Sequence, residues 1–179
     1  MKLINIAEKS AYTQSYTGVK SIDGVKFFPI RNFVGDEGDF CEVIRLDEKG
    51  FVEGVEGFQL RQQNRARSFP GSIKAWHFHH QQDEMWYVPP HRQMFVGLWD
   101  LRDDSPTKNF RMRLNLGAGN SRLLYIPRGV AHGYANFSGN SVDLFYFANN
   151  QFSLENPDEN RVSWDFDEES RQFWTPERD

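Results

Sequence analysis

Residues 71–84 of the chain read GSIKAWHFHHQQDE and hold three of its five histidines. Side chains alternate along a β-strand, so His77 and His79 are expected on one face and Trp76 on the other. Glu84 follows His79 by five residues. Two imidazoles on one face, joined by a carboxylate, are potential ligands of a divalent metal ion. The stretch therefore predicts a strand that carries ionisable groups into a β-structure.

A second stretch, residues 127–136, reads PRGVAHGYAN. Its proline and glycine are typical of a tight turn, which would bring His132 into the same interior from an adjacent strand. The spacing of the two stretches resembles the two motifs of the cupin superfamily, and this resemblance implies a jelly-roll barrel. His91 stands where the first motif usually ends in glycine. The matching positions are Gly71, His77, His79 and Glu84 in the first motif, and Pro127, Gly129, His132 and Asn136 in the second.

Short apolar segments separated by turn-forming residues recur along the chain. Strands are predicted at residues 94–101, 111–116, 123–126 and 142–147, and the best helix candidate is residues 165–171. We expect an all-β fold, a cupin jelly-roll barrel of antiparallel strands with a few short helices. No linker divides the chain, so one cupin domain is expected over residues 1–179. Within it we expect N-terminal strands at 1–60, a barrel core at 61–150 and a C-terminal tail at 151–179.

The composition of the 179 residues excludes several classes of protein. Apolar residues make up 39% and charged residues 26%, unlike a long disordered chain. A net charge of −4 argues against a nucleic-acid partner, which needs a concentrated basic face. The apolar runs are too short to span a membrane, so no membrane partner is expected. The single cysteine, Cys41, cannot form an internal disulfide, and this favours a cytoplasmic location.

Four segments resemble the dTDP-4-dehydrorhamnose 3,5-epimerase family, and together they span roughly residues 36–165. The most specific are DLRDDSPT at residues 100–107 and LYIPRGVAHGY at residues 124–134. QQNRARS at residues 62–68 and KAWHF at residues 74–78 also match. The chain is therefore identified as a divergent, short member of that family.

The resemblance implies an isomerase that acts on a nucleotide-linked 4-keto-6-deoxyhexose, epimerised at its 3-position, its 5-position or both. Such a reaction belongs to deoxysugar biosynthesis for a surface polysaccharide or O-antigen. Within the resemblance, His77 is the base that removes a proton beside the ketone, and Tyr146 returns a proton from the opposite face. No metal or other cofactor is implied. The positions that match sugar- or nucleotide-contacting residues are Glu42, Gln62, Asn64 and His132, with Lys74 where the family has arginine.

The residues themselves suit this chemistry. A proton beside a carbonyl is weakly acidic, so a base must lie close and the enolate must be stabilised. Histidine titrates near neutral pH and serves as a base without extreme tuning. The resemblance further implies a homodimer whose subunits exchange N-terminal strands, for which residues 25–30 are the candidate.

Three departures from the family leave alternatives open. Met85 stands where the family has a lysine that helps to stabilise the enolate, and no counterpart is evident for the C-terminal aspartate that pairs with the catalytic histidine. His79 replaces a glutamine. One alternative is a metal-dependent cupin enzyme that holds a divalent ion between His77, His79, Glu84 and His132. The other is a cupin that binds a sugar nucleotide without catalysis.

Overall fold

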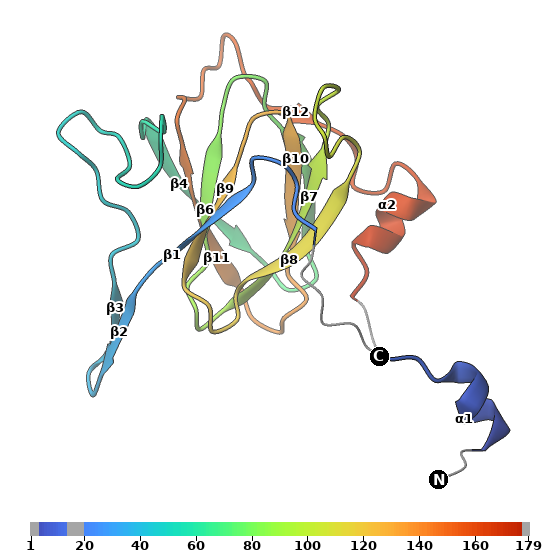
Figure 1. Ribbon diagram of the computed structural model, residues 1–179. Coiled ribbons are helices and arrows are strands. Elements are labelled where there is room, and N and C mark those ends of the chain that lie inside the picture. The colour runs from blue at the N-terminus through green and yellow to red at the C-terminus, as the bar shows by residue number, and fades with distance from the viewer. Residues whose placement is uncertain (1–3, 14–19, 177–179) are drawn as a thin grey trace.

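Alternating apolar residues pair along strands β7 (Gln93–Asp100) and β8 (Arg111–Gly117), where Val96 lies opposite Leu114. The computed structural model describes residues 4–13 and 20–176 (Figure 1). The other described elements are α1 (Asn5–Ser10), β1 (Lys26–Pro29), β2 (Asn32–Gly35), β3 (Gly38–Cys41), β4 (Gln62–Ser68), β5 (Ile73–Phe78), β6 (Glu84–Tyr87), β9 (Arg122–Ile126), β10 (Val130–Ala135), β11 (Val142–Ala148), β12 (Asn160–Arg161) and α2 (Glu168–Phe173).

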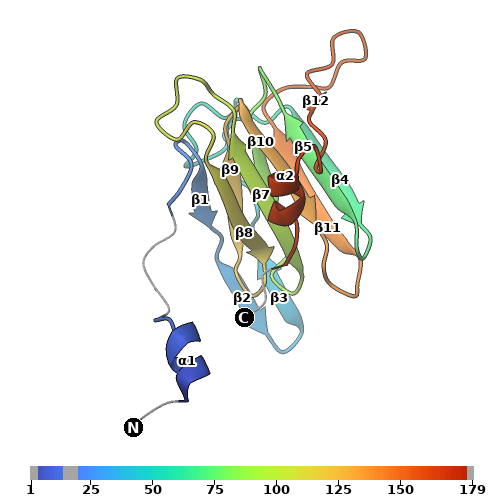
Figure 2. The same ribbon diagram turned by 90° about the vertical axis from the view of Figure 1, so that its right-hand side faces the viewer.

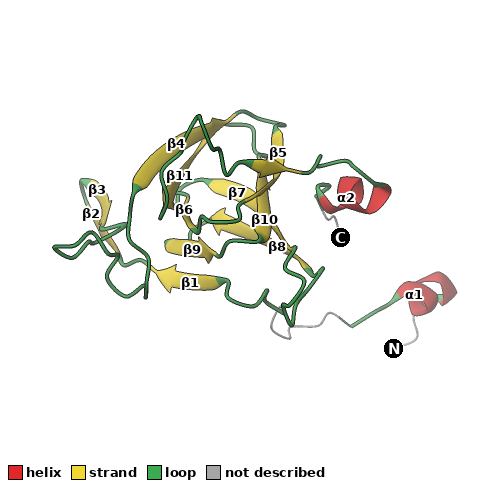
Figure 3. Cartoon of the chain, turned by 90° about the horizontal axis from the view of Figure 1, so that it is seen from above, coloured by secondary structure: helices red, strands yellow, loops and turns green. Residues whose placement is uncertain are grey.

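Two five-stranded antiparallel sheets form the body of the fold. One has the strand order β1-β9-β6-β11-β4 and the other the order β12-β5-β10-β7-β8. Seen from above, the strands enclose a common interior (Figure 3). The short hairpin β2–β3 projects beside this body (Figure 1). The expected all-β jelly-roll fold with short helices is confirmed.

The interior is filled by apolar side chains that alternate along the strands. Met94, Val96 and Leu98 of β7 are completely buried in the main core, together with Leu124 and Leu144 from the other sheet. Strands with this pattern place every second residue inside. Phe95 and Trp99 of β7 face outward, where a second layer of side chains packs against them.

That second layer is aromatic and fixes the orientation of β5. Helix α2 lies against the outer face of the sheet that contains β5, β10 and β7 (Figure 2). Trp76 of β5 is fully buried beside Trp174, with ring centroids 4.8 Å apart. Because side chains alternate, an outward Trp76 turns its neighbour His77 toward the interior of the barrel.

The four predicted strands are all present, each within one residue of the expected bounds. Helix α2 begins at Glu168 rather than residue 165, because Asp167 caps it by accepting a hydrogen bond from the backbone N–H of Ser170. The pattern did not predict α1, the β2–β3 hairpin or β12. Strand β1, within the segment considered for exchange between subunits, pairs here with β9 of its own chain.

Candidate active site

One end of the barrel interior holds a polar cavity with walls from both sheets. Lys74, His77, His132 and Tyr134 come from strands β5 and β10 of one sheet, while Glu84, Trp86 and Tyr146 come from β6 and β11 of the other. His79, Glu159 and Arg161 complete the polar lining. The cavity thus gathers bases, acids and cations around a space between two sheets.

His77 stands near the end of β5 and lies directly opposite His132 of β10. Its Nδ1 atom is 3.5 Å from a carboxylate oxygen of Glu159. Its Nε2 atom is buried and has no hydrogen-bond partner among the described residues. One ring nitrogen therefore faces a carboxylate, and the other has no protein partner among the described residues.

Burial lowers the pKa of His77 to about 3, and the positive charges of Arg161 and Lys74 act in the same direction. The imidazole is therefore neutral at neutral pH, which is the form that accepts a proton. The opposite wall holds Tyr146, whose pKa is raised by burial and by the nearby carboxylates of Glu84 and Glu159. Its phenol is protonated at neutral pH and able to donate.

Glu159 reaches His77 through a pairing that the sequence analysis did not predict. Strand β12 pairs with the end of β5 and places Arg161 opposite His77. Asp158, which directly precedes Glu159, accepts hydrogen bonds from the backbone N–H groups of His80 and Gln81, at 2.8 and 2.7 Å. These bonds fix the returning tail over the histidine stretch. The tail therefore supplies a carboxylate to the base, although as glutamate rather than aspartate.

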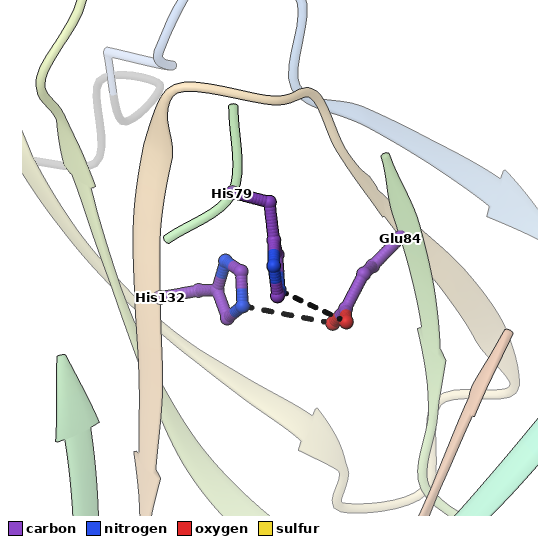
Figure 4. A group of neighbouring side chains, drawn as sticks. All are labelled: His79, Glu84 and His132. Carbon is purple, nitrogen blue, oxygen red and sulfur yellow. Dashed lines mark ion pairs between the residues drawn. The ribbon is translucent and has the colours of Figure 1, made fainter. Parts of the chain in front are cut away.

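A second group of side chains, His79, Glu84 and His132, converges deeper in the cavity (Figure 4). The Nε2 atom of His79 lies 3.3 Å from Glu84 Oε1, and that of His132 lies 3.6 Å from Glu84 Oε2. Burial lowers the pKa of His79, but the hydrogen bond and charge of Glu84 outweigh it and raise the value to about 9. Burial likewise opposes ionisation of Glu84, yet the two histidines and Trp86 lower its pKa to about 2. His79 and Glu84 thus form a buried ion pair, while burial lowers the pKa of His132.

Comparison with known proteins identifies the family. The family model for dTDP-4-dehydrorhamnose 3,5-epimerase matches residues 19–177. The chain belongs to this family. It is accordingly an isomerase of the dTDP-sugar epimerase class, as the sequence indicated.

Individual relatives agree with this assignment. The spore coat polysaccharide biosynthesis protein SpsL of Bacillus subtilis is 38% identical over 144 residues, which cover 80% of this chain and 91% of SpsL. The dTDP-4-dehydrorhamnose 3,5-epimerase of Shigella flexneri is 29% identical over 74% of this chain and 73% of its own. A crystal structure of the Bacillus anthracis dTDP-4-dehydrorhamnose 3,5-epimerase, with TDP and PPi bound, superposes with a TM-score of 0.68 at 28% identity, covering 82% of each chain.

The expected contact residues of this epimerase lie in three places. Lys74, His77, His132 and Tyr146 line the cavity. Asn64 lies directly opposite Tyr146 in the β4–β11 pairing, and the side chain of Gln62 donates to that of Asn64 at 3.0 Å. These two amides do not line the cavity themselves, but they share a strand face with Ala66, which does.

Glu42 lies apart from the cavity within this chain. It is exposed after β3, forms a two-bond ion pair with Arg45, and borders a separate hollow beside the β2–β3 hairpin. Its sequence match to the family therefore does not correspond to a position in this chain's own cavity.

Met85 also points away from the cavity, into an outer apolar cluster that includes Phe58 and Phe147. The inward residues of β6 are its neighbours, Glu84 and Trp86. Where the sequence comparison placed a missing lysine, the cavity wall therefore presents a carboxylate. Among the described residues, no helix has the length and apolar character needed to cross a membrane.

Proposed function

We propose that this enzyme epimerises a dTDP-linked 4-keto-6-deoxyhexose by removing and returning a proton on a carbon beside the ketone. Family membership supports the substrate class. The similarity to SpsL, whose name links it to spore coat polysaccharide, supports a role in making a deoxysugar for a surface polysaccharide. Either the 3-position, the 5-position or both are candidates for the reaction.

The observation that carries the proposal is the placement of His77 and Tyr146 on opposite walls of one cavity. Epimerisation requires a proton to leave one face of a carbon and another to arrive on the opposite face. The free Nε2 of His77 accepts the proton from carbon, and the electron pair of the broken C–H bond moves to the ketone oxygen. The O–H of Tyr146 then delivers a proton to the other face.

The protonation states at neutral pH favour this assignment of roles. Burial lowers the pKa of His77 and raises that of Tyr146, so the base is unprotonated and the acid is protonated before reaction. Glu159, at Nδ1 of His77, stabilises the imidazolium that forms when the proton arrives. We assign Glu159 the role of a positioning residue.

Two cationic side chains in the cavity wall are the candidates for binding the diphosphate of the sugar nucleotide. Lys74 and Arg161 both line the cavity, and both carry their charges close enough to influence His77. A diphosphate bound by these two side chains would hold the attached sugar beside the histidine, since phosphate is recognised by paired basic groups. Arg161 is held at the cavity by β12, which pairs with β5.

Incubation of the protein with a dTDP-linked 4-keto-6-deoxyhexose in D₂O tests the proposal. Deuterium is expected at the carbons beside the ketone, and nuclear magnetic resonance shows whether the 3-position, the 5-position or both exchange. Tyr146→Phe is expected to keep exchange while epimer formation falls by about 10²–10⁴-fold. Tyr87→Phe is the control, because Tyr87 is on β6 but packs in the outer cluster. Tight binding of the sugar nucleotide without any exchange would instead indicate a binding protein.

A further inference from the structure

We propose that the hydroxyl of Tyr134 is a catalytic hydrogen-bond donor to the ketone oxygen of the sugar. The inference rests on the proposed function and deepens it, because this oxygen becomes negative when His77 takes the neighbouring proton. Tyr134 has no part in the roles assigned above, although it lies in the wall of the same cavity.

Tyr134 lies at the boundary between the apolar core and the polar cavity. Its ring belongs to the main core and makes an edge contact with Trp86, with ring centroids 6.0 Å apart. The residue is only 7% exposed, yet it lines the cavity. Among the described residues, none forms a hydrogen bond with its hydroxyl. Buried polar groups are normally hydrogen-bonded, so the expected partner is an acceptor on a molecule that enters the cavity.

The position of Tyr134 relative to the base suits a donor to the ketone oxygen. Tyr134 follows His132 by two residues on β10, and His132 lies opposite His77. Residues two apart on a strand are about 7 Å apart, and both of these line the cavity. The contact with Trp86 shows that the ring of Tyr134 extends toward the opposite sheet, which carries Tyr146. The ketone oxygen lies in the carbonyl plane, between the face of the neighbouring carbon that loses a proton and the face that receives one. A donor between the base and the acid therefore meets this oxygen at its edge.

The neighbouring donors are already engaged within the protein. The Nε2 atom of His79 and the indole nitrogen of Trp86 face the carboxylate of Glu84, at 3.3 and 2.6 Å. The Nδ1 atom of His132 is 3.0 Å from the carbonyl oxygen of Val130, which only accepts hydrogen bonds, so Nδ1 carries a proton. Burial lowers the pKa of His132. Its ring is therefore neutral at neutral pH, and its Nε2 has no proton to donate to a ketone.

The phenol of Tyr134 has the chemistry that the enolate requires. Burial and the nearby Tyr146 raise the pKa of Tyr134 to about 12, so its hydroxyl keeps its hydrogen at neutral pH. A donor aimed at the oxygen where negative charge develops lowers the barrier to proton removal. Tyr134 keeps its hydrogen throughout, and only its bond to the oxygen strengthens. The inward carboxylate of Glu84 accepts hydrogen bonds only, so it cannot replace the lysine that the sequence comparison found missing.

Deuterium incorporation from D₂O by Tyr134→Phe tests the inference. The variant keeps the ring that packs in the core, and an unchanged Tm checks its fold. We expect exchange beside the ketone to fall about 10²–10³-fold. The Kd of dTDP, which carries no ketone, should stay the same in isothermal titration calorimetry. Tyr146→Phe should differ by keeping exchange while it loses epimer formation. Tyr87→Phe is the matched control and should exchange like the wild type, because Tyr87 packs in the outer cluster.

Exchange by Tyr134→Phe at the wild-type rate would overturn the inference and leave the proposed function intact. If Tyr134→Phe does not fold, a crystal structure of His77→Ala with the dTDP-linked 4-keto sugar decides the matter. The Tyr134 oxygen is expected about 2.7–3.1 Å from the ketone oxygen. A ketone oxygen held only by other side chains would refute the role. The same contact in a protein whose wild type exchanges no deuterium would defeat the proposed function and leave the hydrogen bond to the ketone standing.

Discussion

Glu159 lies 3.5 Å from Nδ1 of His77, and the proposed mechanism gives it the role of positioning that ring. Its side chain is 39% exposed, so it contacts the ring from the rim of the cavity rather than from the core. We predict that Glu159→Gln lowers kcat about 10–100-fold with little change in KM, because the forming imidazolium loses its counter-charge. Steady-state kinetics with the sugar nucleotide measures both constants.

The matched control is Glu155→Gln, an exposed glutamate in the same tail. It should leave kcat and KM unchanged. An effect of Glu159→Gln on KM alone would show that Glu159 contacts substrate rather than positioning the base. Rescue by Glu159→Asp, which keeps the charge, would support the positioning role.

The sequence alone predicted some of the residues that line the cavity. The histidine stretch and the IPRGVAHG segment led to His77 and His132, and the family match led to Lys74 and Tyr146, all of which line the cavity. Glu159 and Arg161 were missed because they reach the cavity through a pairing between β12 and β5, about 80 residues apart, which no local pattern encodes. The run of Asn, Pro, Asp and Glu before β12 was the available signal.

At the scale of elements, the alternation of side chains along β6 decides which of its residues enter the cavity. Counting residues placed Met85 at the site, whereas the register of β6 turns Glu84 and Trp86 inward. A shift of one residue moves a side chain to the opposite face. The strands themselves were predictable because their apolar alternation is local. His79 groups with Glu84 and His132, and His77 does not belong to this group. Strand β5 ends at Phe78, so His79 lies beyond the strand, and the sequence pattern did not indicate this end.

Helix α2 docks on β7 through a position that admits no side chain. A Cβ atom at Gly97 would lie 2.5 Å from Phe173 Cε1 and 2.7 Å from Trp174 Cη2. We predict that Gly97→Ala destabilises the fold by about 1–3 kcal/mol, because the two rings must move from the aromatic layer behind β5. Thermal or urea unfolding measures the loss. Gly139→Ala, where no atom lies within 4 Å of the added Cβ, should unfold like the wild type; equal stability of both variants would contradict the docking argument.

At the scale of the whole molecule, we expect the stability in acid to depend on the buried Asp100. Burial raises its pKa, but hydrogen bonds from Arg102, Ser105 and Thr107 outweigh this and hold the pKa well below the usual aspartate range. The folded state thus binds fewer protons than the unfolded state. The stabilisation is present above about pH 4 and is lost as pH falls toward the folded pKa.

We predict that Asp100→Asn is less stable than the wild type at pH 7 and that the difference shrinks as the pH is lowered below 4. Urea unfolding at a series of pH values measures it. Asp103→Asn alters an aspartate whose side chain is 91% exposed, and it should follow the wild-type curve. A difference for Asp100→Asn that does not vary with pH would exclude the proposed electrostatic cause.

The β2–β3 hairpin presents apolar side chains to solvent, with Phe33, Val34 and Phe40 exposed by 48%, 80% and 67%. From this surface and the family resemblance we propose that the enzyme is a homodimer associated through the hairpin. Light scattering should give twice the chain mass of 21.0 kDa, and Phe40→Asp should give the single-chain mass. Phe69→Asp, at an exposed position elsewhere, is the control. A wild-type mass of one chain would refute the dimer.

The proposed reaction requires His77 as the base, and transfer of solvent deuterium to carbon tests this most directly. A dTDP-linked 4-keto-6-deoxyhexose is mixed in D₂O with the wild type, His77→Ala or His91→Ala, and deuterium beside the ketone is followed by nuclear magnetic resonance. We predict rapid incorporation with the wild type and His91→Ala, and a rate at least about 10²-fold lower with folded His77→Ala. Incorporation by His77→Ala at the wild-type rate would exclude His77 as the base.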